Sequence, residues 1–334
     1  MKKYIKWAVG AVIIALLFSF PRLFNDRYFI QIATMMGIIS IASLGLNLIF
    51  GYTGQISLGH AAFYAIGAYS AVIAENWTGL SFWLATPLAV AVCALVGLTV
   101  GVPILRLRHH YLAMATLGLG IIVEVILTQW SDVTGGAVGI FNIKRPVFAG
   151  EELAETGYYY LVLAALLLSL TFVSNLINSR VGRALIAVRE NEDAAGSLGI
   201  NIARHKNIAF VISTAMAGLA GSLYAHLNQF ISPETFTMRQ SIQFLAMIVI
   251  GGLGSNAGAI VGAVTLTILP ELLYGFEDYS LIVYGIILLL FMIFLPDGLI
   301  GLYHKLSGLK TFAVPQNNQP ELAGKAEEYG KGVG

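Results

Sequence analysis

The sequence predicts an all-α membrane protein, a polytopic helical bundle of about ten transmembrane or half-membrane helices with the N and C termini in the cytoplasm. Of its 334 residues, 57% are hydrophobic and only 11% are charged, whereas about a quarter of the residues of a soluble domain are charged. Several uncharged runs reach the roughly 20 residues that span a hydrocarbon core. The net charge of +1 gives no reason to expect nucleic acid as a partner.

The order of the apolar runs gives the predicted spans. They are 7–20, 28–49, 59–76, 81–104, 110–130, 158–178, 207–229, 240–252, 256–273 and 279–296. The first follows a basic start and resembles a signal peptide, but no small-residue cleavage site follows it, so we interpret it as an uncleaved span. The short span 240–252 and the join 49–59 are typical of segments that line a transport path, because unpaired backbone is tolerated only inside protein or a wet cavity.

The distribution of Lys and Arg sets the predicted orientation. With the N-terminus inside, twelve basic residues of the membrane domain fall on the inner side and five on the outer side. The membrane domain is expected over 1–310 and a disordered cytoplasmic tail over the polar, Gly- and Pro-rich 311–334. The outer loop 131–157 is either a solvated linker or a landing surface for a periplasmic partner.

The inner segment 180–206 is densely charged and lies between two uncharged runs. Asn191 followed by two acidic residues predicts a helix start, and Gly199 can end that helix. Ala194, Ala195 and Leu198 would fall on one face of this helix and fit a groove of another protein; the alternative is a helical hairpin without a partner. The residues that we expect to couple to a partner are Arg183, Arg189, Asn191, Glu192, Asp193, Ala194, Ala195, Leu198 and Gly199.

Polar residues within apolar runs are the other candidates. The candidates for lining a pathway are Asn47, Gln55, Ser57, His60 and Glu124. The first four surround the join 49–59, which is either a lined pathway or the turn of a helical hairpin. A carboxylate at the depth of Glu124 should face protein or water, as a proton relay, a substrate contact or an interhelical hydrogen bond.

Glycine pairs mark two further features. The glycines of 51–54 and 251–254 both follow an apolar run, which is a weak internal echo between the two halves. The Gly97-xxx-Gly101 and Gly258-xxx-Gly262 spacings predict close approach of packed helices.

Catalytic motifs are absent from the sequence. It has no Walker A motif, and the G-x-G-x-x-A match at 252–257 lies between membrane spans rather than between a strand and a helix. No His or Cys spacing is typical of a metal site. We therefore expect a chain that is not an enzyme and that holds no cofactor or metal.

Three blocks carry a family resemblance: SLGLNLIFGYTGQISLGHAAFYAIGAY (43–69), RVGRALIAVRENEDAAGSLGIN (180–201) and IGGLGSNAGAIVGA (250–263). They resemble the permeases of branched-chain amino-acid ABC importers, in particular the LivM branch, and the similarity extends over about 28–300. The permeases of urea importers carry near-identical blocks. The resemblance implies a multi-pass protein of the bacterial inner membrane.

The resemblance also implies the partners and the substrate. The partners would be a homologous second permease, two cytoplasmic ATPase subunits that hold ATP and Mg, and a periplasmic substrate-binding protein. The coupling helix would be 191–199, and the loop 131–157 would receive the binding protein. The expected substrates are Leu, Ile and Val, and the alternative substrate is urea or a short amide. The alternative function is that of a proton-coupled secondary transporter that uses Glu124.

Overall fold

The computed structural model describes residues 16–23, 26–107, 110–148 and 150–273, and then 285–286, 289–291, 293–295 and 298–306. The long helices are α2 (Arg27–Thr53), α3 (His60–Thr78), α4 (Phe82–Ile104), α5 (His110–Gln129), α7 (Glu155–Asn178) and α10 (Ile202–Asn228). The shorter ones are α6 (Ser131–Thr134), α8 (Arg180–Glu190), α9 (Glu192–Ser197), α11 (Met238–Gly251), α12 (Asn256–Leu272) and α14 (Gly298–Leu306).

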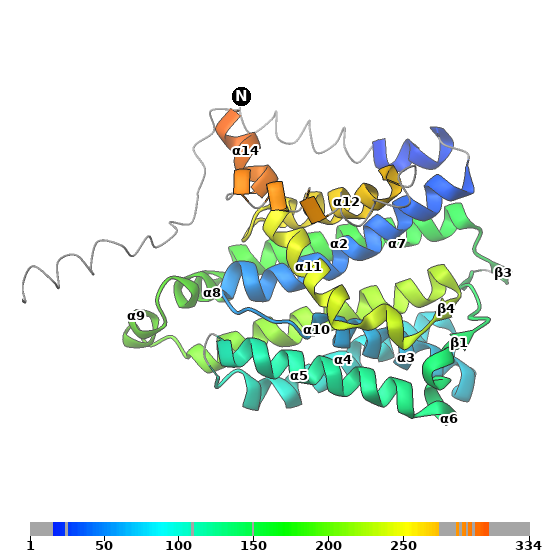
Figure 1. Cartoon of the computed structure of the whole chain (residues 1–334), viewed down its shortest axis with the longest axis horizontal. Coiled ribbons are helices and arrows are strands. Elements are labelled where there is room, and N and C mark those ends of the chain that lie inside the picture. Colours follow the sequence, from blue (N-terminus) through cyan, green and yellow to red (C-terminus); the bar gives the residue numbers. More distant parts are fainter. Residues whose placement is uncertain are drawn as a thin grey trace, which may run out of the picture.

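The described helices form one bundle around α2 and α10 (Figure 1). The apolar windows of α2 and α10 are 72% and 67% buried, whereas those of α4 and α5 are 22% and 17% buried. α10 packs against α2, α3 and α4, while α2 also packs against α7 and α12. α2 and α10 are therefore the core, and much of the surface of α4 and α5 remains uncovered by this chain.

Small residues allow the core helices to approach closely. A Cβ on Gly221 of α10 would lie 1.9 Å from the carbonyl oxygen of Tyr64 on α3. Cβ atoms on Gly97 and Gly262 would likewise lie 2.1 Å from Thr214 Oγ1 and 1.8 Å from the Met247 carbonyl oxygen. The predicted close approach at both glycine pairs is confirmed, for α4 on α10 and for α12 on α11.

Eight of the ten predicted spans are found as helices whose ends differ from the prediction by a few residues. Five of them are long and apolar enough to cross a membrane, whereas α11 and α12 are shorter apolar helices. The predicted tail 311–334 and most of the spans 7–20 and 279–296 lie outside the described residues. The chain is a polytopic all-α membrane protein, as predicted.

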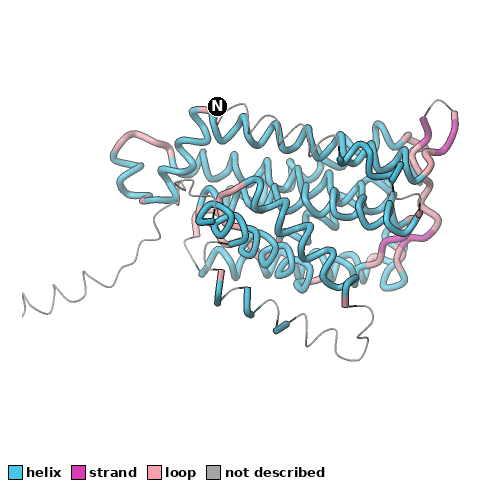
Figure 2. The backbone as a smooth tube through the Cα atoms, turned by 90° about the horizontal axis from the view of Figure 1, so that it is seen from above, coloured by secondary structure: helices cyan, strands magenta, loops and turns pink. Residues whose placement is uncertain are grey.

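The two ends of the bundle differ. An arm formed by α8 and α9 extends from one end, and the short strands of the described residues lie at the other (Figure 2). β1 (Ile140–Phe141) pairs with β4 (Phe230–Ile231), and β2 (Val147–Phe148) pairs with β3 (Glu151–Glu152), both antiparallel. Following the predicted orientation, we call the arm end the inner end and the strand end the outer end. The 3₁₀ turns η1 (Gly136–Val138) and η2 (Pro233–Phe236) also lie at the outer end.

The close contact of α3 and α10 makes a testable prediction about stability. Gly221→Ala should lower the midpoint of thermal unfolding in detergent, because overpacking of this kind costs about 1–3 kcal/mol. Gly118→Ala is the matched control, since a Cβ at Gly118 meets nothing within 4 Å and alanine favours the helix. An unchanged midpoint for Gly221→Ala would show that the two helices separate easily.

Candidate functional site

The inner arm consists of two capped helices. Ser179 accepts hydrogen bonds from the backbone N–H groups of Val181 and Gly182 at the start of α8. Asn191 accepts one from the backbone N–H of Ala194 at 2.9 Å and so caps α9, and Gly199 adopts a left-handed φ of +81° just after that helix. The predicted short helix within 191–199 is confirmed, with the expected cap and end.

Helix α8 was not predicted, although the sequence contains its pattern. Val181, Ala184, Leu185 and Val188 follow the i, i+3, i+4, i+7 spacing of an amphipathic helix. Leu185 and Val188 are fully buried against the bundle. This apolar spacing is sufficient to predict the helix, although the many charged residues around it make the spacing hard to recognise.

The expected apolar face of α9 is divided between two directions. Leu198 is 81% exposed, and Ala194 is also exposed, so these two residues share an outward face. Ala195 is only 2% exposed and faces the interior of the chain. The prediction that all three residues form one docking face is therefore wrong, because Ala195 is one helical step of about 100° away from its neighbour.

An ion pair holds α9 on the bundle. The Nζ atom of Lys206 lies 2.5 Å from Glu192 Oε1, and the Lys206 side chain is 5% exposed. Breaking such a buried pair leaves an uncompensated charge, which is strongly destabilising. Glu192 therefore fixes the arm within this chain, whereas Asp193, Arg183 and Arg204 lie exposed around it.

The two glycine turns that echo one another in the sequence lie side by side. The amide of Asn47, which is fully buried, accepts a hydrogen bond from Gly254 N at 3.0 Å and donates one to the carbonyl of Ser255 at 3.2 Å. The Tyr52 hydroxyl donates to Asn256 Oδ1 at 3.0 Å. Asn47 thus joins the turn 51–54 to the turn 251–254. Because both ends of its amide are used, it is not available to line a pathway in this conformation.

Arg189 connects the arm to both turns. Its guanidinium donates a hydrogen bond to the carbonyl of Gly51, and a Cβ on Gly254 would lie 2.9 Å from its Nη1. Burial lowers the pKa of the Arg189 guanidinium below its ordinary value, with Glu190 and Tyr52 acting in the opposite direction. An arginine stays charged after such a shift. Arg189 thus forms a direct link between α8 and the junction of α2 and α12.

The segment 54–59 turns back into the bundle. His60 Nε2 lies 2.9 Å from the carbonyl oxygen of Ala42, which is about 16 Å along α2 from its end at Thr53. Side chains satisfy the freed backbone: Leu58 N donates to Thr116 Oγ1 and Ala61 N to Ser241 Oγ, both at 3.0 Å. Non-helical backbone at this depth is typical of the sites of transporters.

Three of the five predicted pathway residues lie in or next to the segment 54–59. Gln55, Ser57 and His60 are each 5% exposed or less, and His60 packs edge-on against the ring of Phe244 at 5.6 Å. Both amide atoms of Gln55 are buried and have no hydrogen-bond partner in the described residues. The segment 54–59, which we call the re-entrant segment, therefore carries a buried amide without a partner among the described residues. The sequence indicated that Gln55 lies in this segment, but it did not indicate that its amide is unpaired.

Glu124 lies apart from these residues, on α5. It is half-buried and follows Gly120 by one turn, where a Cβ would lie 3.9 Å from the Leu58 carbonyl oxygen. Within the part of the chain that the structure describes, its carboxylate makes no hydrogen bond or ion pair, so the expected interhelical hydrogen bond is not found there. That part also contains no group of three His, Cys, Asp or Glu residues that could hold a metal.

A buried contact between a histidine and a carboxylate at the outer end was missed from the sequence. His226 Nε2 lies 2.9 Å from Glu75 Oε1, and their side chains are 0% and 15% exposed. The ring of Phe82 packs on His226 at 4.8 Å. The pair joins the ends of α3 and α10, and no local pattern connects residues 151 positions apart.

Comparison with known proteins identifies the family. The model of the branched-chain amino acid transport system permease component matches residues 28–292. The chain belongs to this family. It is 40% identical over 299 residues to the LivM permease of Salmonella typhimurium (strain LT2) and 39% identical to that of Escherichia coli (strain K12); both alignments cover 82% of this chain and 70% of the relative.

This permease is also similar to LivH permeases. The LivH protein of Salmonella typhimurium is 26% identical over 288 residues, which cover 80% of this chain and 92% of the relative. No solved structure matches the chain. The higher identity to LivM makes this permease one of the LivM type, as the three sequence blocks indicated.

The Arg189 connection makes a prediction about transport. Arg189→Ala should lower the transport rate about tenfold or more, because a hydrogen bond to a charged group contributes about 1.5–3 kcal/mol. The measurement is the transport rate in proteoliposomes at matched protein levels. Arg180→Ala is the control, since Arg180 lies exposed at the start of the same helix and is not among the residues expected to couple to a partner. Normal transport by Arg189→Ala would exclude this connection.

Proposed function

We propose that this permease is the transmembrane subunit of a binding-protein-dependent ABC importer that moves leucine, isoleucine and valine into the cytoplasm, driven by ATP hydrolysis on partner ATPase subunits. The observation that carries the proposal is the inner arm, whose Arg189 bonds the turn that precedes the re-entrant segment. The names of the permease's relatives support the substrate class.

The proposed mechanism begins at α9. Its outward face, with Leu198 and Ala194 between exposed charges, would dock in a groove of an ATPase subunit. ATP and Mg would be held by the two ATPase subunits, because this sequence has no phosphate-binding loop. Movement of the docked arm would pull on the turn 51–54 through Arg189. Since that turn leads into 54–59, the pull would alter the re-entrant segment.

The coupling is a shift between two conformations. ATP binding can favour one arrangement of the junction only by as much as the ATPases bind that arrangement more tightly. The junction suits such a change, because its bonds are made by side chains, either to backbone or to one another, and can be exchanged without unwinding α2 or α12. The permease provides the path, and the partners provide the energy.

The remaining partners belong to the same proposal. A homologous second permease would cover the exposed faces of α4 and α5, including Glu124. A periplasmic substrate-binding protein would dock at the outer loop 131–157. The complex would lie in the bacterial inner membrane.

Reconstituted transport tests the function. Vesicles would contain this permease with its partner permease and ATPases, and labelled leucine and labelled urea would be compared with the binding protein added. We expect leucine uptake that stops when ATP or the binding protein is withheld. Uptake of urea and not of leucine would show that the proposed substrate is wrong. Uptake of leucine without ATP would show that the proposed ATP-driven import is wrong.

The secondary-transporter alternative is tested by Glu124→Gln in the same vesicles. The proposed importer retains most of its uptake, because no counter-ion within the described residues marks Glu124 as a proton or ion site. A complete loss of uptake at a normal protein level would favour proton coupling.

The docking face of α9 makes a separate prediction. Leu198→Arg should abolish ATP-dependent uptake, because a charge replaces the exposed apolar contact, while membrane insertion and thermal stability stay normal. Ala195→Arg is the contrast, since Ala195 is buried in this chain and its replacement should lower stability as well. Full uptake by Leu198→Arg would remove docking from this face.

A further inference from the structure

Two neighbouring cavities lie at the outer end of the bundle, opposite the inner arm. The larger, between α2, α10 and α12, has a volume of about 210 Å³; the smaller, between α2, α7 and α10, has about 10 Å³. Gln31 and Leu227 line both. The larger cavity is below the 300–1,000 Å³ of sites for drug-sized ligands, so it suits one small metabolite, and the smaller suits one water molecule.

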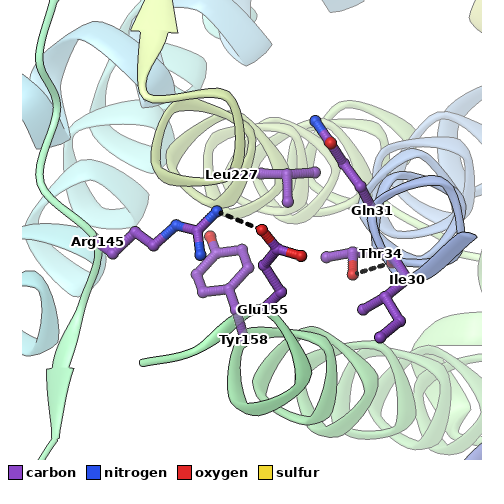
Figure 3. A pocket seen from close by; sticks show the side chains of 7 residues that line it. All are labelled: Ile30, Gln31, Thr34, Arg145, Glu155, Tyr158 and Leu227. Carbon is purple, nitrogen blue, oxygen red and sulfur yellow. Dashed lines mark hydrogen bonds and ion pairs between the residues drawn. The ribbon is translucent and has the colours of Figure 1, made fainter. Parts of the chain in front are cut away.

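Two polar atoms beside these cavities lack a protein partner. Asn228 Nδ2, at the larger cavity, and Glu155 Oε2, at the smaller, are buried without a hydrogen bond in the described residues. Figure 3 shows the Glu155 carboxylate between Arg145, which it contacts at 3.4 Å, and Thr34. Buried polar groups in proteins are almost always paired, so these atoms point to a water or a ligand.

The larger cavity is lined by both aliphatic and polar side chains. Ile32, Met35 and Leu227 provide aliphatic surface. Gln31 and Asn228 provide amide donors, and Glu271, which accepts a hydrogen bond from the Tyr28 hydroxyl, provides a carboxylate. A positive group, a negative group and an aliphatic chain on one small molecule would each find a matching part of this wall.

We propose that the larger cavity is an outer binding site for a zwitterionic amino acid with an aliphatic side chain. The amides of Asn228 and Gln31 donate to its α-carboxylate, and Glu271 accepts from its α-ammonium group. The side chain contacts Ile32, Met35 and Leu227. Its place on a transport path rests on the proposed function, whereas the binding chemistry rests on these residues alone. Urea has neither charges nor an aliphatic part, so it matches little of this wall.

Binding of labelled leucine tests the site. The assembled permeases and ATPases would be placed in nanodiscs without nucleotide and without the binding protein, so that any leucine bound is bound by the membrane complex. Asn228→Leu should weaken binding about tenfold or more, because it removes the donor to a charged carboxylate. It should leave thermal stability unchanged or higher, since it also removes an unpaired buried group.

A matched pair of variants tests the location. Thr267→Phe should abolish binding by filling the cavity that Thr267 lines. Thr265→Phe, two residues away on the same helix and outside the cavity, should leave binding unchanged. Among the described residues, each threonine bonds one carbonyl of its own helix, Thr267 at 2.7 Å and Thr265 at 2.8 Å, so the two changes remove equivalent interactions.

Competition defines the ligand chemistry. Isoleucine and valine should displace leucine, whereas leucinamide, which lacks the carboxylate, 4-methylpentanoate, which lacks the ammonium group, and urea should not. Wild-type affinity in both Asn228→Leu and Thr267→Phe would overturn the site. If uptake of leucine by the complete system is normal in that case, the proposed function stands without it; if the complete system takes up urea and no leucine, the function itself fails.

Discussion

The need to satisfy backbone polar groups inside the bundle governs the arrangement around the 54–59 segment. Once α2 ends at Thr53, the chain re-enters the interior without a helix, and its N–H groups find side-chain acceptors on other elements. Exposed backbone at this depth would be costly. Thr116 of α5 and Ser241 of α11 supply these acceptors and so tie both helices to the start of α3.

The junction of the two glycine turns depends on the same chemistry. Only glycine permits the approach at Gly51, where a Cβ would lie 2.7 Å from the backbone nitrogen of Gly254. Asn47 then bonds the backbone of the second turn with both ends of its amide. The result is a contact between α2 and α12 that is specific in geometry but formed by a few side chains, and Arg189 reaches it from the inner arm.

Much of this fold could be predicted because hydrophobic length has few alternatives in a membrane. The spans, the capped helix α9 and the glycine contacts all follow from local patterns. The direction of Ala195 could not be predicted, because the pattern of so short a helix does not show which of its faces turns toward α8 and α10. The Glu75–His226 pair and the bonds of Asn47 could not be predicted either, because they join residues far apart in the chain. The sequence placed Gln55 near the site, but only the structure shows that its amide lacks a partner in the described residues.

Helix α10 has fixed attachments at both of its ends. Near its start, Lys206 is paired with Glu192 of the arm, and just beyond its end β4 pairs with β1 of the outer loop. Its 27 residues make a rod of about 40 Å. A ligand or protein that displaces the outer loop therefore acts on the same rigid body as one that displaces the arm. By linkage, if binding of an outer partner changes the affinity for an inner partner by some factor, binding of the inner partner changes the affinity for the outer partner by the same factor.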